Sequence, residues 1–296
     1  MLVIANADAG AGETEALETA LAVLREDVDV EVAKTGNLGE LDGVLHRAGC
    51  RRIVVAGGDG SLHSVVAALY RRHELEKRTL GLIPLGTGND FARTLGIPLD
   101  AGAAAAIIVA GSVRKMDLIV DELGGVVVNN VHAGASAQAS RRGHRWKKRL
   151  GPYGFGIFGY PIGAALAAFR PPFVRLLIEV DGEVLADMDR HVLMVAVGNG
   201  ASVGGGTEVT PDADPEDGKL DVMVSYATGP VERFVYAAQL YRGSHPERDD
   251  VLYRRAKQIT VSGEDFWLSA DGEIQGPERR RSWRLERAAY SMIVPD

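Results

Sequence analysis

The sequence predicts an α/β plus all-β protein, with an N-terminal three-layer α/β domain followed by a C-terminal antiparallel β domain. Before about Met116, short apolar strands alternate with helical patterns, which is typical of a parallel sheet covered by helices. After Met116, strand patterns dominate, and a single helix is expected to begin near Pro230. We therefore place the domains at residues 1–116 and 117–296, with a cleft between them.

Several short apolar runs separated by turn residues predict that the second domain is built from β-strands. A hairpin turn is expected at Asp181-Gly182. The expected strands are residues 126–129, 173–180, 184–187, 192–197, 220–226, 258–261 and 266–269. The residues of the Pro230 helix that are expected to face inward are Val231, Phe234, Val235 and Ala238.

Composition favours a cytoplasmic globular enzyme. The chain has 296 residues, of which 46% are hydrophobic and 25% charged, so it can form a large hydrophobic core and fold without stabilising cross-links. The single cysteine, Cys50, excludes an intrachain disulfide and fits a reducing compartment. A net charge of -7 argues against nucleic acid as a partner. The longest apolar stretch, residues 154–169, is interrupted by Pro161 and is too short to span a membrane.

Residues 53–61 read Ile-Val-Val-Ala-Gly-Gly-Asp-Gly-Ser, an apolar strand that ends in glycines around one carboxylate. A helix begins at or just after Ser61, since apolar residues follow at helical spacing. Such a loop presents free backbone N–H groups at the positive end of a helix dipole, which suits phosphate. Gly57, Gly58 and Gly60 would let a polyphosphate approach the backbone. An ordinary flexible turn is the alternative.

Two further loops of this kind argue against an ordinary flexible turn. Residues 86–93 follow an apolar run, and Thr87 offers a hydroxyl to a phosphate oxygen while Asn89 or Asp90 can cap the next helix. Residues 6–12 follow the apolar residues 2–5 and precede a helix with a leucine stripe. Three strand-loop-helix units in one half of the chain favour a nucleotide site.

Four motifs resemble, in order, the bacterial diacylglycerol kinase catalytic family, which is related to sphingosine and ceramide kinases. They are residues 57–61, residues 84–93, Gly204-Gly205-Gly206 followed by residues 211–221, and Asp271-Gly272-Glu273. The resemblance covers nearly the whole chain. It implies a phosphofructokinase-like first domain, a β-sandwich-like second domain, and a last strand, about residues 284–296, that can return to the first domain. The chain departs from the family's usual residues at Ala7, Ala11, Ser61, His63 and Ser64, where the family usually has Pro, Lys or Ser, Thr, Asn and Glu. These departures leave open how tightly, and which, nucleotide is held.

The resemblance implies ATP as phosphoryl donor and Mg²⁺ as metal. A carboxylate beside bound phosphates is favourable chiefly when Mg²⁺ or its waters lie between them, so we expect Asp59 to organise the metal. Thr35 also fits an ordinary turn before Gly36, and the sequence does not separate the two readings. The residues expected to bind the nucleotide are Asn6, Gly10, Thr35, Gly57, Gly58, Asp59, Gly60, Ser61, Gly86, Thr87, Asn89 and Asp90.

Two acidic motifs in the second half carry the remaining expected chemistry. Residues 212–219 are rich in hard oxygen donors, and the resemblance assigns a Mg²⁺ to Asp214, Asp217 and the backbone of Lys219; a solvated acidic loop is the alternative. Asp271-Gly272 is by local rules a hairpin turn. The resemblance instead implies that Asp271 is the general base for the acceptor hydroxyl and that Glu273 assists it.

Cationic side chains gather at residues 141–149, around Trp146 and next to an apolar segment. This run is either a solvated face or a contact with an anionic membrane surface, where Trp and cations are favoured.

We predict an ATP-dependent lipid kinase that phosphorylates a primary hydroxyl, with diacylglycerol as the first candidate, in the cytoplasm or at the inner face of the membrane. One alternative is an enzyme like the NAD kinases, which share the Gly-Gly-Asp-Gly loop. The other is a catalytically inactive module that binds nucleotide or lipid. The sequence leaves a homodimer open.

Overall fold

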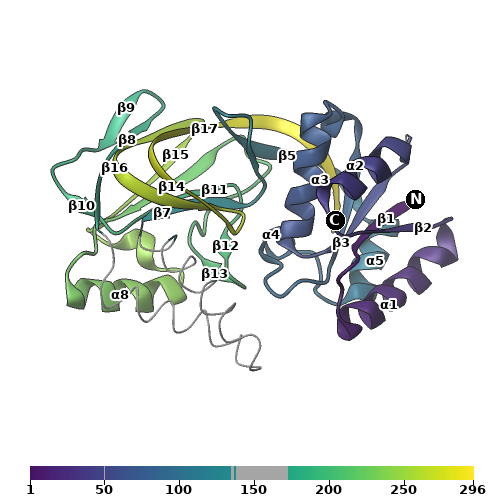
Figure 1. Ribbon diagram of the computed structural model, residues 1–296. Helices are drawn as coiled ribbons and strands as arrows, with labels where there is room; N and C mark the ends of the chain where they lie inside the picture. The colour runs from purple at the N-terminus through teal and green to yellow at the C-terminus, as the bar shows by residue number, and fades with distance from the viewer. Residues whose placement is uncertain (50, 135–136, 138–172) are drawn as a thin grey trace.

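The computed structural model of the protein describes residues 1–49, 51–134, 137 and 173–296, which form two lobes (Figure 1). The N-terminal lobe contains a parallel sheet in the order β2-β1-β3-β4. Its strands are β1 (Leu2–Asn6), β2 (Glu31–Thr35), β3 (Ile53–Gly57) and β4 (Thr79–Pro84). Its helices are α1 (Ala11–Asp27), α2 (Leu38–Arg47), α3 (Asp59–Arg71), η1 (Leu75–Lys77), α4 (Asp90–Thr94) and α5 (Ala101–Ala110).

The parallel sheet lies between two helical layers because successive strand side chains point to opposite faces. Val3 and Ala5 pack in one cluster with the buried faces of α1 and α5, whereas Leu2 and Ile4 pack in another with α2 and α3. The predicted stripes are buried as expected, among them Leu62, Val65, Val66 and Leu69 of α3 and Leu17, Leu21 and Leu24 of α1. The predicted three-layer arrangement is therefore confirmed.

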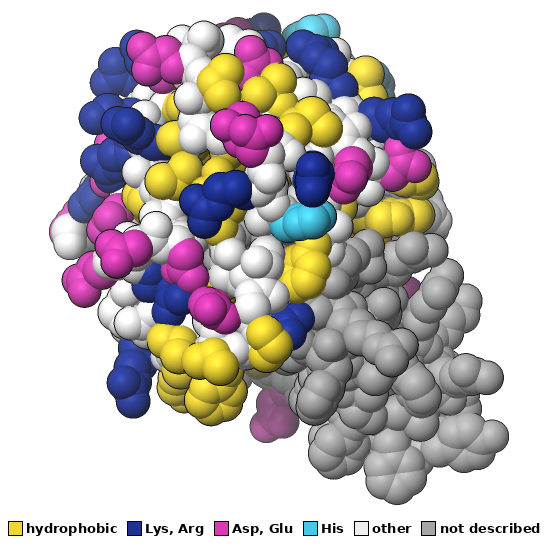
Figure 2. Space-filling model, turned by 90° about the vertical axis from the view of Figure 1, so that its left-hand side faces the viewer, with side chains coloured by type: hydrophobic (Ala, Val, Ile, Leu, Met, Phe, Trp, Pro, Cys, Tyr) yellow, Lys and Arg dark blue, Asp and Glu magenta, His cyan; other side chains and the backbone are white. Residues whose placement is uncertain are grey.

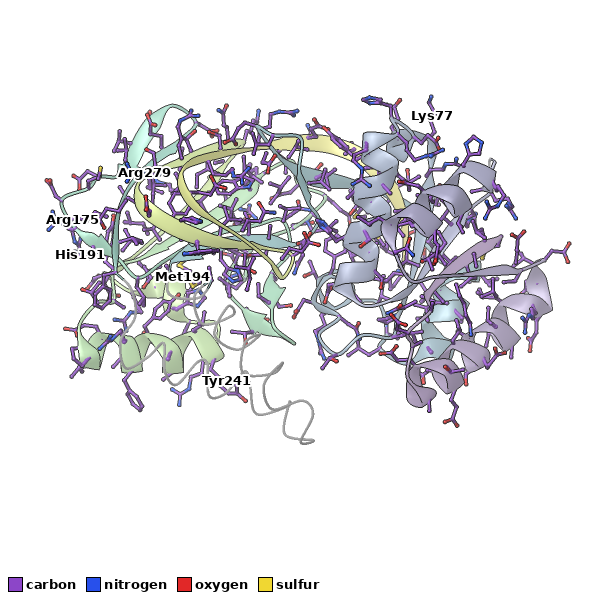
Figure 3. All side chains as sticks on the ribbon, in the orientation of Figure 1. Lys77, Arg175, His191, Met194, Tyr241 and Arg279 are labelled. Carbon is purple, nitrogen blue, oxygen red and sulfur yellow. The ribbon has the colours of Figure 1, made fainter. Side chains whose placement is uncertain are left out.

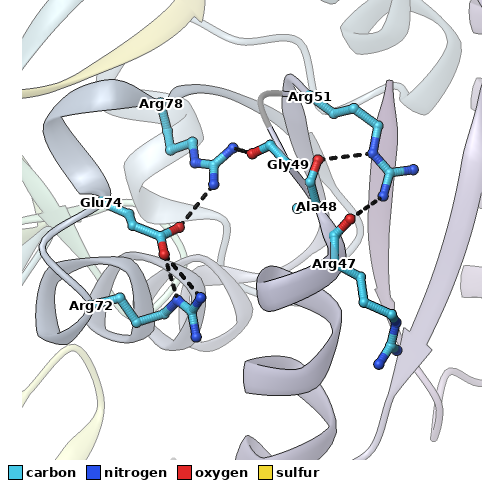
Figure 4. A network of polar contacts seen from close by, with 7 residues as sticks. All are labelled: Arg47, Ala48, Gly49, Arg51, Arg72, Glu74 and Arg78. Carbon is cyan, nitrogen blue, oxygen red and sulfur yellow. Dashed lines mark hydrogen bonds and ion pairs between the residues drawn. The ribbon is translucent and has the colours of Figure 1, made fainter.

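Arginines terminate α2 on the side of this lobe shown in Figure 4. Arg51 donates to the carbonyl oxygens of Arg47 and Ala48, each at 2.9 Å, and Arg78 donates to the carbonyl of Gly49. Glu74 bridges Arg78 and Arg72, whose guanidinium groups hold the pKa of Glu74 below its ordinary value. Helix ends leave such carbonyls unpaired, so these cations have a structural role.

The C-terminal lobe is built from antiparallel pairs of strands. Its β-sandwich-like core contains Ile178, Val195, Val222, Ile259 and Trp283. The remaining strands of the chain are β5 (Ser112–Asp121), β6 (Val126–Val127), β7 (Asn130–Gly134), β8 (Val174–Val180), β9 (Glu183–Ala186), β10 (His191–Val192), β11 (Met194–Gly198), β12 (Ser202–Val203), β13 (Thr207–Glu208), β14 (Leu220–Ser225), β15 (Val251–Ala256), β16 (Gln258–Ala270) and β17 (Glu273–Val294). The helices of this lobe are α8 (Pro230–Tyr241) and η4 (His245–Glu247).

The last strand, β17, is 22 residues long and joins the two lobes. It pairs with β16 in the C-terminal lobe and then runs, parallel to β4 and antiparallel to β5, into the N-terminal sheet. Both chain ends consequently lie in the same lobe (Figure 1). One hydrogen-bonded sheet therefore runs through both lobes.

Two expectations about local structure need comment. The hairpin turn forms as predicted, with positive φ angles of 50° at Asp181 and 87° at Gly182, as the tight turn requires. The two runs predicted at residues 258–261 and 266–269 are parts of one bulged strand, β16, because its register against β17 shifts between Ser262 and Phe266 without ending the pairing.

The prediction for the inward face of α8 is wrong. Val231 and Phe234 are 71% and 78% exposed, and Val235 and Ala238 are exposed as well. The helix packs instead through Tyr236, whose ring lies edge-on at 5.8 Å from the ring of His245. Both sides of this helix are apolar, so periodicity alone did not select the packed one. Tyr241 lies at its exposed end (Figure 3), and Figure 2 shows hydrophobic side chains among charged ones at this end of the molecule.

The predicted basic run at 141–149 and the apolar segment beside it lie outside the described residues, as does Cys50. Within the described part of the chain, no helix has both the length and the apolar character needed to cross a bilayer.

Candidate functional site

A pocket of about 520 Å³ lies at the carboxyl ends of the parallel strands, where ligands of open α/β sheets bind. We call it the first pocket. Its wall includes the ends of β1 and β2, the start of α3 and one residue of β17. The predicted site residues that line it are Asn6, Thr35, Gly58, Gly60, Ser61 and Glu273.

The glycines of the first loop have different structural surroundings. A Cβ on Gly58 would lie 2.9 Å from the Cα of Gly86, and one on Gly57 would lie 2.4 Å from the Oγ of Ser61. Protein packing therefore accounts for Gly57, Gly58 and Gly86. A Cβ on Gly60 would meet no atom within 4 Å, although Gly60 lines the pocket. The space beside Gly60 is open to a ligand.

Asp59 begins α3 and also holds the start of α4. Its two carboxylate oxygens accept hydrogen bonds from the backbone N–H groups of Asp90 and Phe91, each at 3.0 Å. Burial raises the pKa of the Asp59 carboxyl, and these two N–H groups oppose that rise. This contact joins the first and second glycine loops, and no local sequence pattern predicts it.

None of the polar side chains of the second loop lines the first pocket. Asn89 adopts a φ of 52°, and its amide accepts from the N–H of Gly86 at 3.0 Å and donates to the carbonyl of Gly86 at 2.7 Å. It therefore braces its own loop, and the side chain that caps α4 belongs to Asp59. The carboxylate of Asp90 faces the C-terminal lobe, whereas Thr87 and Gly10 are exposed and line neither this pocket nor the second one below.

Asp271 is buried where the lobes meet. It has a φ of 45°, and its carboxylate accepts backbone N–H groups from Val128 at 2.7 Å, Asn129 at 2.9 Å and Asn130 at 3.1 Å. A fourth contact comes from Nδ1 of His63 at 2.8 Å. Only 1% of the Asp271 side chain is exposed.

A second pocket, of about 250 Å³, opens between α3 and the hairpins of the C-terminal lobe. We call it the second pocket; His63, Arg71, Asp121 and Leu123 are among the residues that line it. Glu273 lines both pockets, so this carboxylate marks their border. A group transferred from a ligand in the first pocket to one in the second would pass this border.

The acidic loop lies at the junction of the lobes. Asp117 of β5, almost fully buried, accepts from the N–H of Gly218 and from that of Ala288 in β17, each at 2.7 Å. Asp214 is exposed and accepts from the N–H of Glu216 at 2.9 Å, whereas Asp217 accepts from that of Lys219 at 2.9 Å and pairs with Arg255.

Across the described ranges, no group of three or more His, Cys, Asp or Glu side chains has the arrangement of a metal site. Two carboxylates and a backbone carbonyl are nevertheless the oxygen donors that a hard cation prefers, so the donor chemistry of Asp214, Asp217 and Lys219 fits Mg²⁺.

Sequence reasoning missed the importance of His63 and Asp117. In the sequence His63 is only a departure from a family's usual residue, because its contact with Asp271 spans 208 positions of sequence. Asp117 lies in an ordinary strand pattern, so no local signal distinguishes it from an exposed strand aspartate.

Family comparison matches the two lobes to two different domain families. Residues 1–120 match the family described as "Diacylglycerol kinase catalytic domain", and residues 129–288 match the "YegS C-terminal NAD kinase beta sandwich-like domain". "Diacylglycerol kinase" of Staphylococcus aureus (strain JH9) is 31% identical over 238 residues, covering 79% of this chain and 72% of that protein. The Newman strain protein gives the same values.

Solved structures agree with this match. A structure described as that of a diacylglycerol kinase from Bacillus anthracis str. Sterne has a TM-score of 0.75 at 26% identity, covering 99% of this chain and 96% of the other. A second structure from that organism has a TM-score of 0.78 at 24% identity with the same coverage, and shows likeness of fold. The chain belongs to the diacylglycerol kinase family and is an enzyme of the lipid kinase class.

Proposed function

We propose that this enzyme transfers the γ-phosphoryl group of ATP to a primary hydroxyl of a membrane lipid, with diacylglycerol as the first candidate. The observation that carries the proposal is the position of Glu273 at the border of the two pockets. A phosphoryl transfer needs its donor and acceptor held in line and close together. Two pockets that share one carboxylate would hold a donor and an acceptor close together.

The first pocket is the proposed nucleotide site. Its volume of about 520 Å³ lies in the range of small-molecule sites. Phosphates would lie beside Gly60 and Ser61, at the N-terminal end of α3, where backbone N–H groups and the helix dipole favour anions. Asn6 and Thr35, at the ends of β1 and β2, line the same pocket and would contact the nucleotide.

The remaining predicted nucleotide residues act through the loops in this proposal. Gly58 and Gly86 let the two glycine loops touch, and Gly57 leaves room for Ser61. Asn89 braces the second loop, and Asp59 joins that loop to α3. Asp90 connects the second loop to the C-terminal lobe. Gly10 and Thr87 stay nucleotide-contact predictions that neither pocket supports.

The second pocket is the proposed acceptor site. The acceptor hydroxyl must lose its proton as its oxygen attacks phosphorus. Asp271, expected to be the base, has both oxygens engaged by four donors, so it is poorly placed to touch a substrate. Glu273, His63 and Asp121 line this pocket and could exchange a proton. The carboxylate of Asp121 is already engaged by the N–H groups of Leu123 and Gly125 and by Arg281, which leaves Glu273 and His63 as the candidates.

Mg²⁺ is the proposed metal. A bound Mg²⁺ would supply charge neutralisation for the phosphates. We also propose a Mg²⁺ held by Asp214, Asp217 and the carbonyl of Lys219, which would fasten the acidic loop at the lobe junction. Mg²⁺ should then raise the melting temperature of the wild-type protein, and Asp214→Asn and Asp217→Asn should abolish that rise. Asp212→Asn, in the same loop but outside this donor set, should retain it.

The direct test is incubation of the purified protein with Mg²⁺, labelled ATP and diacylglycerol in mixed micelles. We expect labelled phosphatidic acid, which is phosphorylated diacylglycerol. A panel of other lipid alcohols would establish the acceptor class. Label appearing in NAD in place of lipid would identify the enzyme as an NAD kinase, the acceptor suggested by the name of the second matched family. ATP binding without label transfer to any acceptor would indicate an inactive module.

A further inference from the structure

We propose that His63 is the group that takes the proton from the acceptor hydroxyl, with Asp271 behind it as the residue that orients its ring. This inference rests on the proposed kinase function and names a catalytic residue for it. The sequence does not predict that these two residues are in contact, because His63 belongs to α3 and Asp271 to the turn between β16 and β17.

The geometry separates the two residues into an inner and an outer member. Asp271 is the inner one, since 1% of its side chain is exposed and four donors surround its carboxylate. His63 is the outer one, since 15% of its side chain is exposed and it lines the second pocket. An acceptor in that pocket would therefore meet the imidazole and not the carboxylate.

The contact with Asp271 also determines which ring nitrogen is basic. A carboxylate accepts hydrogen bonds, so Nδ1 of His63 carries a proton and donates it to Asp271 across 2.8 Å. In the neutral ring, Nε2 then carries the lone pair. A carboxylate behind an imidazole holds the tautomer and stabilises the imidazolium that forms when Nε2 gains a proton.

The proposed step balances as follows. The acceptor hydroxyl gives its proton to Nε2 of His63 while its oxygen forms a bond to the γ-phosphorus of ATP. The bond between that phosphorus and the β,γ-bridging oxygen breaks, and ADP leaves with the electron pair. The imidazolium charge is then paired with the Asp271 carboxylate.

The charges around His63 support a base that works near neutral pH. Burial lowers the pKa of His63, but the hydrogen bond and charge of Asp271 and the charge of Glu273 outweigh it, so the pKa is raised above its ordinary value. Arg71 opposes that rise, and Asp121 lines the same pocket. General bases are most effective when their pKa lies near the working pH. Glu273 is the rival base, since it borders both pockets.

His63→Asn tests the proposal, because Asn still donates a hydrogen bond but cannot accept the proton. We expect kcat to fall about 10²- to 10⁴-fold, the usual contribution of a positioned base, with little change in the KM for ATP. In the wild type, kcat/KM should decline as the pH falls below the pKa of His63, because the neutral ring is the active form. That decline should disappear in His63→Asn. His73→Asn, at an exposed histidine with a φ of 53°, should leave both the rate and the pH profile unchanged.

Wild-type kcat in His63→Asn would overturn the inference. So would a pH decline that survives in His63→Asn but is lost in Glu273→Gln, since Glu273 would then be the base. A second readout does not depend on turnover: the NMR titration of the His63 ring should move to lower pH in Asp271→Asn, and an unmoved titration would break the proposed pairing. A wild type that phosphorylates no acceptor would refute the proposed function itself, whereas an active wild type with an equally active His63→Asn would refute only this inference.

Discussion

The carboxylate of Asp90 lies 2.7 Å from the backbone nitrogen of Gly206, across the junction of the two lobes. Gly205 donates to the same carboxylate at 3.0 Å, and Ser202 donates through its hydroxyl at 3.2 Å. Gly204, Gly205 and Gly206 all have positive φ angles, of 71°, 93° and 105°, a conformation in which successive N–H groups converge on an anion. The glycine run thus binds a carboxylate of the protein itself.

Asp90→Ala should therefore loosen the junction. The N–H groups of Gly205 and Gly206 would lose a charged acceptor at a partly buried site, and loss of a hydrogen bond to a charged group costs about 1.5–3 kcal/mol in the free energy of unfolding. Kinase activity should fall with it, because Asp90 connects the second glycine loop to the lobe that carries Asp271. Urea denaturation and an activity assay would measure the two effects.

Asp100→Ala provides the matched control for Asp90→Ala. Asp100 caps α5 in the N-terminal lobe by accepting from the N–H of Ala103 at 2.8 Å. Loss of such a cap costs about 0.5–2 kcal/mol of stability and should leave activity intact. Equal activity of the two variants would contradict the assigned role of Asp90.

Gly60→Ala separates ligand space from protein packing. A methyl group at residue 60 meets no protein atom, and alanine is favoured over glycine within a helix by about 1 kcal/mol, so the variant should be at least as stable as the wild type. If phosphates lie beside Gly60, the Kd for ATP should rise about tenfold, equivalent to about 1.4 kcal/mol. Gly43→Ala, in α2 and outside the pocket, should increase stability and leave the Kd for ATP unchanged. Unchanged ATP affinity in Gly60→Ala would move the phosphates elsewhere.

Phe234→Ser tests which face of α8 packs. Because Phe234 is 78% exposed, its replacement should change the free energy of unfolding by no more than about 0.5 kcal/mol. Tyr236→Ala, in the same helix but with a buried side chain, should cost about 3–5 kcal/mol. Thermal or urea unfolding of the pair would decide, and a large loss in Phe234→Ser would restore the face that the sequence predicted.

The sequence predicted the two-lobe fold because its signals are local. The strands β1, β2 and β3 end in glycine or small polar residues and are each followed by a helix with an apolar face, which makes the strand-loop-helix order recognisable from the sequence. Short apolar runs and one tight turn predicted the antiparallel lobe in the same way. The face of α8 was not predicted correctly, because both of its sides are apolar.

The site was less predictable because its geometry depends on contacts between distant residues. Glycines in a sequence indicate a loop, but they do not show whether a ligand or protein atoms occupy the space beside them, as Gly58 and Gly60 illustrate. Carboxylates are similar: Asp59, Asp90 and Asp271 all look available in the sequence, and all three accept backbone N–H groups in the structure. Only the folded chain reveals which acid remains to face a substrate.

His132 makes the stability of the C-terminal lobe depend on pH. It lies in β7 between β11 and β16, and burial lowers its pKa to about 4. An unfolded chain binds a proton at this residue near pH 6.5, whereas the folded chain does not until about pH 4. The unfolded state therefore holds more protons in this window, and the free energy of unfolding should fall as the pH is lowered through it, by about 3 kcal/mol at most. His132→Leu removes the titrating group, so its unfolding free energy should depend less steeply on pH between 6.5 and 4 than that of the wild type, as urea titrations at several pH values would measure. His46→Leu, at an exposed position of α2, should keep the wild-type slope. If the slopes of all three proteins coincide, His132 is not the buried neutral group assigned to it.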